Sequence, residues 1–543
     1  MAATEVSQGE RTGSFVRQSS GLIREFGISD VILINVVGVN LGIVAALSIA
    51  TVAGLWPGAS MIVVVLIGAI VSLATVSVYG MFSAAMPRAG GDYVFVGRSL
   101  TPWVGFLANW MITLSLFVLL GLFSVGTITE AFAPALAAFG LVANSHGLVS
   151  AAETLTTDKT LIAFLSVGLI AVASAIAITG DKAVKWTFRI LGVVGVVGIA
   201  IMAVSLLTTS HTGWINNMND ALGRYHGGSI EGIKGAAEKS GFSDVGFSWS
   251  ASLAAIPFAF YAFVGLTYTS YLGGEIQRPQ KTQPWGMFWA LMITLALYIL
   301  LFVGFYHAMG WQNIHAWAFL SGENPEALKF FGESPIGSFL IGAGSGSSVL
   351  AAISLITFTS WFFMIVVFAA IMPIRNLFAW SMDGLIPAAV SKVSRRGTPW
   401  VATLIVAVLA VGMVILTLFS TFVELVVNYT LLYSITFLLA GIAAVAFPYR
   451  RPDIFERAPA IVRTRIGGLP LISIAGAIEA AVFVAIIVEA LRTPAFGGPA
   501  GRTALLVIVG LILAAPAFYA ASRWVRKRQG YDVDAAFRTL PPD

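Results

Sequence analysis

Long apolar stretches separated by shorter polar connections make up most of this chain. Each stretch holds about 20 residues, the length that an α-helix needs to cross a hydrocarbon core of about 30 Å. The pattern therefore predicts an all-α polytopic membrane protein with about twelve transmembrane helices. The expected helices cover residues 29–54, 61–86, 103–128, 160–179, 186–208, 249–273, 285–308, 348–374, 400–418, 422–447, 468–490 and 503–522.

The composition agrees with a protein that lies within a lipid bilayer. Hydrophobic residues make up 58% of the chain and charged residues only 10%, whereas soluble domains carry roughly 25% charged residues. The chain has no cysteine, which excludes disulfides and thiolate chemistry. We find no nucleophile–base motif, phosphate-binding loop, metal-ligand spacing or nucleic-acid-binding surface. We therefore expect no enzyme activity, metal or cofactor, and the expected partners are a small-molecule substrate and the bilayer, with the oligomeric state left open.

The basic residues predict the orientation of the helices. If the N-terminus lies inside, the inner connections and tails hold 24 of the 31 Lys and Arg residues, and the outer connections hold 7. Such an excess is typical of cytoplasmic segments. A missed helix would reverse every later connection and remove the bias. We therefore expect a protein of the cytoplasmic membrane, with cytoplasmic tails at 1–27 and 523–543.

Helix 1 carries polar residues and glycines at membrane depth. Gly38 lies about 15 Å from the inner end of the helix, near the midplane, and Asn35, Asn40 and Gly42 lie close to it. Irregular backbone at this depth is tolerated where it lines a cavity within the protein. The pattern predicts a break in helix 1 near Gly38. The alternative is that these residues only allow close helix packing.

Helix 6 shows a similar pattern at the same depth, in the segment 260–265. Pro257 lies just before that segment and removes one helical hydrogen bond. Helices 1 and 6 are five spans apart and cross in opposite directions, as the first helices of two inverted repeats would. We expect repeats at 28–209 and 249–450, an extracytoplasmic loop at 210–248, and helices 11 and 12 within 451–522.

Two broken helices would form a binding site for a zwitterion without any charged side chain. The amides at one half-helix end suit a carboxylate, and the carbonyls at the other end suit an ammonium group. We expect the amides of 39–42 to face the carboxylate and the carbonyls of Val36, Val37, Tyr261 and Phe263 to face the ammonium, with Phe260 as an aromatic lid. The full candidate set is Val36, Val37, Gly38, Val39, Asn40, Leu41, Gly42, Phe260, Tyr261, Ala262, Phe263 and Gly265.

Four segments in order resemble the amino acid–polyamine–organocation superfamily of permeases. They are Met86-Pro-Arg-Ala-Gly90-Gly91-Asp-Tyr93 after helix 2, Phe260-Tyr-Ala-Phe-Val-Gly265, Gly274-Glu275-Ile-Gln-Arg-Pro279, and Arg375 to Pro387 after helix 8. The resemblance implies the inverted five-plus-five fold of bacterial leucine-type transporters and alternating access. It implies a secondary transporter of amino acids or related amines, of the amino acid permease branch.

Helix 1 departs from the glycine pattern common in that family. The family commonly has Gly-x-x-x-Gly-x-Gly, and here the third glycine position is Val44. This departure leaves room for other cargo, so antiport of a polyamine, another organic cation or another metabolite is the alternative. A channel or a receptor is the rival class of function.

Several polar residues are candidates for gating and energy coupling. Glu275, Arg278 and Asp383 could form inner-gate ion pairs with Arg88, Arg98 or Arg375, or could anchor loops. The hydroxyls of Thr357, Thr359 and Ser360 on helix 8 could hold sodium with helix 1 carbonyls, or could bond within their own helix. Glu275 and Glu424 are the candidate proton carriers. Glu479, near the middle of helix 11, reads as a neutral packing residue because that helix lies outside the expected transport core.

Overall fold

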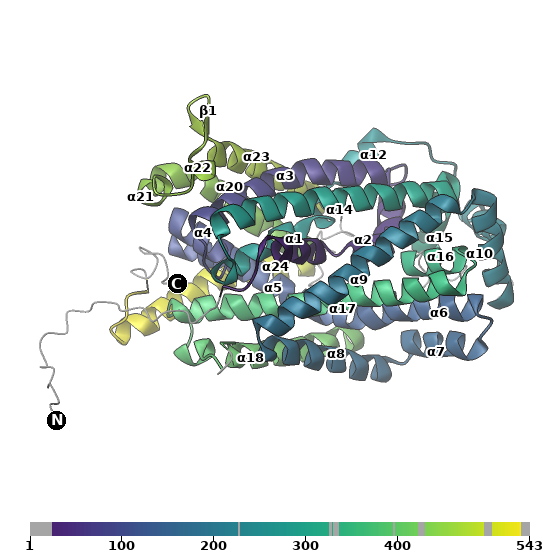
Figure 1. Ribbon diagram of the computed structural model, residues 1–543, viewed down its shortest axis with the longest axis horizontal. Coiled ribbons are helices and arrows are strands. Elements are labelled where there is room, and N and C mark those ends of the chain that lie inside the picture. The colour runs from purple at the N-terminus through teal and green to yellow at the C-terminus, as the bar shows by residue number, and fades with distance from the viewer. Residues whose placement is uncertain are drawn as a thin grey trace, which may run out of the picture.

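The computed structural model describes residues 24–225, 228–324, 328, 336–394, 397–421, 429–493 and 502–533. The described chain is a bundle of long helices (Figure 1), in agreement with the predicted all-α membrane fold. Eleven helical segments in this part of the chain are long and apolar enough to cross a membrane. A further segment, span 6, is interrupted near its middle, and together they account for the twelve predicted spans.

The first six spans include both interrupted helices. Their helices are α1 (Ile28–Val39), α2 (Leu41–Ser48) and η1 (Ile49–Ala53) in span 1; α3 (Met61–Ala85) in span 2; α5 (Pro102–Gly126), η2 (Thr127–Phe132) and α6 (Ala133–Val142) in span 3; α8 (Lys159–Thr179) in span 4; α9 (Asp181–Thr208) in span 5; and α12 (Trp249–Ala254), α13 (Ile256–Tyr261) and η3 (Val264–Tyr271) in span 6. The short 3₁₀ turn η4 (Gly273–Glu275) follows span 6.

The last six spans are single helices. They are α14 (Pro279–Met309), α17 (Ser348–Met382), α18 (Trp400–Phe419), α20 (Tyr429–Arg450), α23 (Leu471–Arg492) and α24 (Arg502–Arg528). Span 3 was predicted to end at 128 but continues to Val142, because the helix extends beyond the apolar window through a π-helical stretch, η2. The inverted-repeat relation between the two sets of helices, and the domain limits based on it, stay predictions.

Shorter elements connect the spans. They are α4 (Asp92–Ser99), α7 (His146–Thr157), α10 (His211–Tyr225), α11 (Ile230–Lys239), α15 (Trp311–Glu323), α16 (Gly337–Gly344), η7 (Ala388–Ser391), α21 (Pro452–Phe455), α22 (Ala460–Arg463) and an antiparallel hairpin of β1 (Arg465–Ile466) with β2 (Leu469–Pro470). The elements α10, α15 and α16 gather at one end of the bundle, and α21, α22 and β1 gather at the other (Figure 1). We call the second end, where α1 begins, the basic end.

Close contact between helices depends on small residues, as is usual in membranes. On α20 and α23, Gly441 and Gly476 face each other, and a Cβ added at either glycine would lie within 3.0 Å of the other's carbonyl oxygen. On α3, a Cβ added at Gly80 would lie 3.1 Å from the Cα atom of Pro284 on α14. These contacts join helix 10 to helix 11 and helix 2 to helix 7.

Candidate functional site

The break in helix 1 lies at Asn40, two residues beyond the position predicted from the glycines. Asn40 separates α1 from α2 and adopts a left-handed conformation with φ 55° and ψ 69°, which asparagine tolerates better than most residues. Its Oδ1 accepts the Ile43 amide at 3.0 Å, and its Nδ2 donates to the Trp361 carbonyl of α17 at 2.7 Å. Gly38 instead lies in the last turn of α1.

The break in helix 6 lies at Ala262 and Phe263, within the predicted segment. The α-helix α13 ends at Tyr261, and the chain continues as the 3₁₀ helix η3. The Ala262 carbonyl accepts the Tyr298 hydroxyl of α14 at 2.9 Å, and the Phe263 carbonyl accepts the Leu266 amide at 3.2 Å. Of the carbonyls predicted to face an ammonium group, that of Phe263 therefore already has a donor. The Val37 carbonyl also has one, because it accepts the Asn40 amide at 3.0 Å, and that amide is in turn not free for a carboxylate.

The two breaks meet with no side chain between them. A Cβ added at Gly38 would lie 2.9 Å from the Gly265 carbonyl oxygen, and a Cβ added at Gly265 would collide with the Gly38 carbonyl. All the candidate binding residues are buried except Tyr261, which is half-buried. The structure thus brings the candidate residues of helices 1 and 6 together in a closed arrangement.

Aromatic rings that the sequence did not indicate lie beside this contact. A Cβ at Gly38 would lie 2.8 Å from the ring of Tyr268, which stacks on Phe368 of α17 with centroids 4.3 Å apart. The Tyr268 hydroxyl is 2.9 Å from that of Tyr433 on α20. Tyr268 lies three residues after Gly265, so its position on the same face of the 3₁₀ helix was the available signal.

The start of α2 offers backbone donors next to the contact. The first amides of any helix have no partner within it. Asn40 already accepts the Ile43 amide, so the free first-turn donors of α2 are the amides of Leu41 and Gly42. They belong to the predicted carboxylate-facing set of 39–42, and the positive end of the helix dipole lies there.

A buried hydrogen-bond network ties helices 1, 6 and 7 together. Asn35 of α1 donates to the Thr269 hydroxyl at 3.0 Å and accepts the Thr269 amide at 3.1 Å. The Thr269 hydroxyl donates to Gln283 Oε1 at 2.8 Å, and Gln283 Nε2 donates to the Thr269 carbonyl at 2.8 Å. Asn35 was noted for its depth but was not in the candidate set, and its partners are distant in sequence and were missed.

Ion pairs hold several helices together at the basic end. Arg375 Nε lies 2.9 Å from Glu275 and its Nη2 2.6 Å from Asp181, and Arg98 pairs with Asp383 at 3.0 Å. The predicted pairs of Glu275 and Asp383 are therefore present, while Asp181 was not foreseen. Burial raises the pKa of Glu275 to about 8. The positive charge of Arg375 acts in the opposite direction, but Glu275 shares that guanidinium with Asp181.

Asp92 forms a second contact between the basic end and helix 6. Its carboxyl group is fully buried and accepts hydrogen bonds from the Tyr271 hydroxyl and from Asn109 Nδ2, the latter at 3.3 Å. Trp380 in turn donates to Asn109 Oδ1 at 2.8 Å. Burial raises the pKa of Asp92 to about 7, although both hydrogen bonds act in the opposite direction. The sequence showed Asp92 only as part of a loop motif.

Comparison with known proteins decides the family. The profile described as Amino acid permease matches residues 28–514, which is most of the chain. The chain belongs to the amino acid permease family. It is a multi-pass membrane transporter of the permease type, in agreement with the resemblance noted in its motifs.

Individual relatives of this permease are distant. The branched-chain amino acid permease BcaP of Lactococcus lactis is 23% identical over 385 residues, or 69% of this chain and 73% of the relative. The methylthioribose transporter of Bacillus subtilis is 23% identical over 438 residues, or 80% and 84%. Cationic amino acid transporter 4 of Mus musculus is 25% identical over 408 residues, covering 74% of this chain but 56% of the relative. The three are named for different cargoes.

The candidate coupling residues of the permease are only partly assembled. A Cβ added at Gly198 of α9 would collide with the Thr357 hydroxyl, so this hydroxyl points toward helix 5 and not toward helix 1. The Thr359 hydroxyl and Ser360 are buried on the same helix. Glu424 lies outside the described residues.

Helices 1 and 5 are joined near the basic end by an ion-pair cluster. Asp30 of α1 lies 2.6 Å from Arg189 and 3.3 Å from Lys185, both on α9. Arg189 is thus a partner of helix 1.

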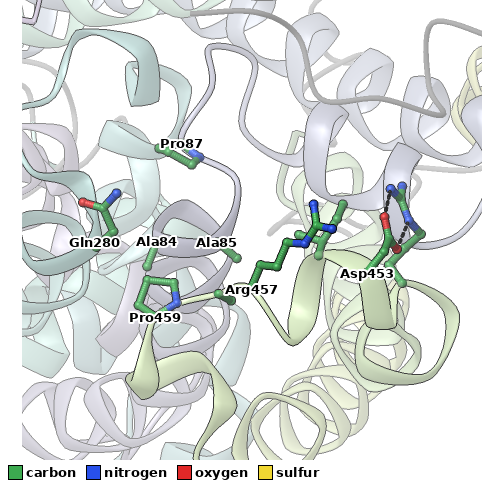
Figure 2. Close-up of a pocket in the computed structure, with 10 residues that line it drawn as sticks. Ala84, Ala85, Pro87, Gln280, Asp453, Arg457 and Pro459 are labelled. Carbon is green, nitrogen blue, oxygen red and sulfur yellow. Dashed lines mark hydrogen bonds and ion pairs between the residues drawn. The ribbon is translucent and has the colours of Figure 1, made fainter.

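A cavity of about 560 Å³ lies at the basic end of the permease, away from the two breaks (Figure 2). Figure 2 shows Pro459 beside Ala84 and Arg457 beside Ala85, with Asp453 paired to a neighbouring arginine. None of the residues that line it belongs to the candidate binding set. This cavity is therefore separate from the meeting point of helices 1 and 6.

Proposed function

We propose that this permease carries neutral amino acids across the cytoplasmic membrane by alternating access, with the basic end and both chain termini in the cytoplasm. The observation that carries the proposal is the meeting of two broken helices at Gly38 and Gly265. A break at the midplane is costly unless a ligand or another helix uses the freed backbone groups. The amides of Leu41 and Gly42 would receive the carboxylate of the amino acid.

A neutral cargo fits the residues around the breaks better than a cationic one. The described side chains at the two breaks are apolar or aromatic, apart from the amide of Asn40. The buried acids Glu275 and Asp92 lie at the basic end and already have partners. An additional positive charge at the breaks would therefore be left without a counter-charge, which is unfavourable in a buried site. Antiport of a polyamine or another organic cation or metabolite is the alternative.

Alternating access would require the ion pairs at the basic end to open. Arg375 and Arg98 join the inner end of helix 6, the start of helix 5 and the end of helix 8 to one another and to α4. We propose that the repeats 28–209 and 249–450 move relative to each other when these pairs separate. The cargo would then leave toward the cytoplasm.

We propose protons as the coupling ion. Asp92 and Glu275 lie outside the membrane-spanning segments and are buried, and burial raises their pKa values to about 7 and about 8. Both can therefore exchange protons near neutral pH. Sodium held by Thr357, Thr359 and Ser360 is the alternative, but the Thr357 hydroxyl points toward Gly198. Glu424 remains a candidate proton carrier.

Thermal unfolding of the purified protein with single compounds tests the cargo. A ligand at a hundred times its Kd raises the free energy of unfolding by about 2.7 kcal/mol. We expect leucine, isoleucine or valine to raise the unfolding temperature more than arginine, putrescine or methylthioribose. A larger shift with arginine or putrescine would favour the cationic alternative.

Counterflow in proteoliposomes then separates a carrier from a channel or receptor. Vesicles loaded with unlabelled leucine should accumulate labelled leucine transiently, since a carrier exchanges cargo across the membrane. A channel would show no such overshoot. Imposing a proton gradient, and separately a sodium gradient with pH clamped, identifies the coupling ion: stimulation by sodium alone would contradict proton coupling.

A further inference from the structure

Glu479 is a carboxyl group in the middle of helix 11, with no charged partner among the residues that the structure describes. It lies eight residues after Leu471, the first residue of α23, and so about 12 Å into the span. The side chain is fully buried, and neither carboxyl oxygen forms a hydrogen bond of good geometry. An ionisable group at this depth is expensive and is usually functional.

The side chains that face Glu479 from α3 carry neutral hydroxyl groups. The Thr75 hydroxyl of α3 faces the carboxyl group, and Tyr79 of α3 interacts with it electrostatically. Among the side chains that the structure describes, the other titratable groups on the elements packed against α23 are Tyr433, Tyr449 and Arg450 on α20, Tyr261 on α13 and Arg463 on α22. Tyr433 bonds Tyr268, and Arg450 and Arg463 are exposed at the basic end.

Helix 11 is in contact with the segment just before the helix 6 break. Phe483, one turn beyond Glu479, packs edge-on against Phe260 with ring centroids 4.8 Å apart. Phe437 of α20 completes the group, 5.2 Å from Phe483 and 5.4 Å from Phe260. A movement of helix 6 therefore changes the packing of the helix face that carries Glu479.

Helix 2 also contacts the part of helix 6 that lies next to its break. A Cβ at Gly68 of α3 would collide with the Ala259 carbonyl and lie 2.9 Å from the Phe263 ring. The two helices that enclose Glu479, α3 and α23, thus both rest on helix 6 next to its break. Tyr79 of α3 lies within electrostatic range of both Glu479 and Asp92.

We propose that Glu479 is a proton-binding site of the transport cycle, protonated while α3, α23 and helix 6 are packed together and deprotonated when helix 6 moves and admits water. The proton passes from the carboxyl group to water, leaving a hydrated carboxylate. This inference rests on the proposed function. It assigns to helix 11 a part in coupling, where the sequence suggested only a packing residue.

The test compares Glu479→Gln with Glu489→Gln in proteoliposomes of the full-length protein, using labelled leucine. Glutamine keeps the shape of the neutral acid but cannot release a proton. Glu489 lies on the same helix, where it is partly exposed and paired with Arg492 at 3.6 Å. Counterflow is measured first without a gradient, and uptake is then measured with an inward proton gradient.

We expect Glu479→Gln to retain counterflow and to lose stimulation by the proton gradient, while the wild type and Glu489→Gln keep both. Proton-stimulated uptake by Glu479→Gln would overturn the proposal, as would wild-type counterflow without proton stimulation. Loss of counterflow in Glu479→Gln would also overturn it, because the neutral form is the one assigned to the packed state. A wild type without any leucine counterflow would instead contradict the proposed function.

A conservative variant keeps the proposal testable if glutamine prevents folding, as judged by gel filtration in detergent. Glu479→Asp retains a titratable group but places it one methylene further from Thr75. We expect coupled uptake with a changed midpoint in its pH profile. An unchanged midpoint, equal to that of Glu489→Gln, would show that Glu479 is a structural residue.

Discussion

The breaks in helices 1 and 6 differ in how they are held. The helix 1 break is one residue long, and the neutral amide of Asn40 both caps α2 and binds helix 8. The helix 6 break leads into 3₁₀ helix as far as Glu275, where the hydrogen-bond geometry is poorer than in an α-helix. Its contacts include titratable groups, namely Tyr271 with Asp92 and Glu275 with Arg375. We infer that helix 1 is the fixed side of the site and helix 6 the mobile side.

The largest expected effect tests whether the two breaks must touch. Gly265→Leu would place a side chain where the Gly38 carbonyl lies, so we expect uptake of leucine to be abolished with normal expression in the membrane. Gly168→Leu is the matched control, because no atom lies within 4 Å of a Cβ added there. Normal uptake by Gly265→Leu would show that the contact is not the site.

Phe260 tests the mobile side. Removing a buried phenylalanine ring costs about 3–5 kcal/mol of stability, and Phe483→Ala should cost a similar amount because the two rings pack together. If Phe260 acts as a lid, Phe260→Ala should reduce leucine uptake more than it reduces equilibrium binding, and more than Phe483→Ala does. Equal losses of binding and uptake would make Phe260 an ordinary wall of the site.

Asn40 tests the fixed side. Alanine at a positive φ costs roughly 1–2 kcal/mol, and loss of the helix cap costs about 1 kcal/mol more. We expect Asn40→Ala to lower the free energy of unfolding by about 2–3 kcal/mol and Asn40→Gly to lower it less, since glycine removes the strain. The free energy of unfolding is measured with denaturant. Equal decreases for Asn40→Ala and Asn40→Gly would contradict a left-handed break at this residue.

Asp92 should have a smaller effect, on the pH dependence of stability, because it holds helix 6 through Tyr271. The folded pKa is about 7 and the ordinary value is 3.8, so between them the folded state binds more protons than the unfolded state. Stability should therefore fall as pH rises through this window, by at most about 1.4 kcal/mol per pH unit. Asp92→Asn should remove this slope in thermal unfolding between pH 6 and 7. A slope that persists would assign the titration to another group.

The sequence predicted the spans and the approximate breaks, because apolar length and mid-membrane glycines are local features. It placed the helix 1 break at Gly38 although Asn40 adopts the left-handed conformation, since composition alone does not show which residue turns the chain. The pairs Asn35–Thr269 and Asp92–Tyr271 are separated by 234 and 179 residues. Such partners become neighbours only through the packing of whole helices, so spacing could not reveal them.

The sharing of Arg375 between two carboxyl groups has a consequence for leakage. Separating only Glu275 or only Asp181 from the guanidinium would leave a buried charge without its partner, which costs several kcal/mol. Half-open arrangements are therefore sparsely populated, and the two contacts open together as one cooperative step. A gate of this kind is rarely half-open. Small ions therefore have few opportunities to cross the membrane between transport cycles.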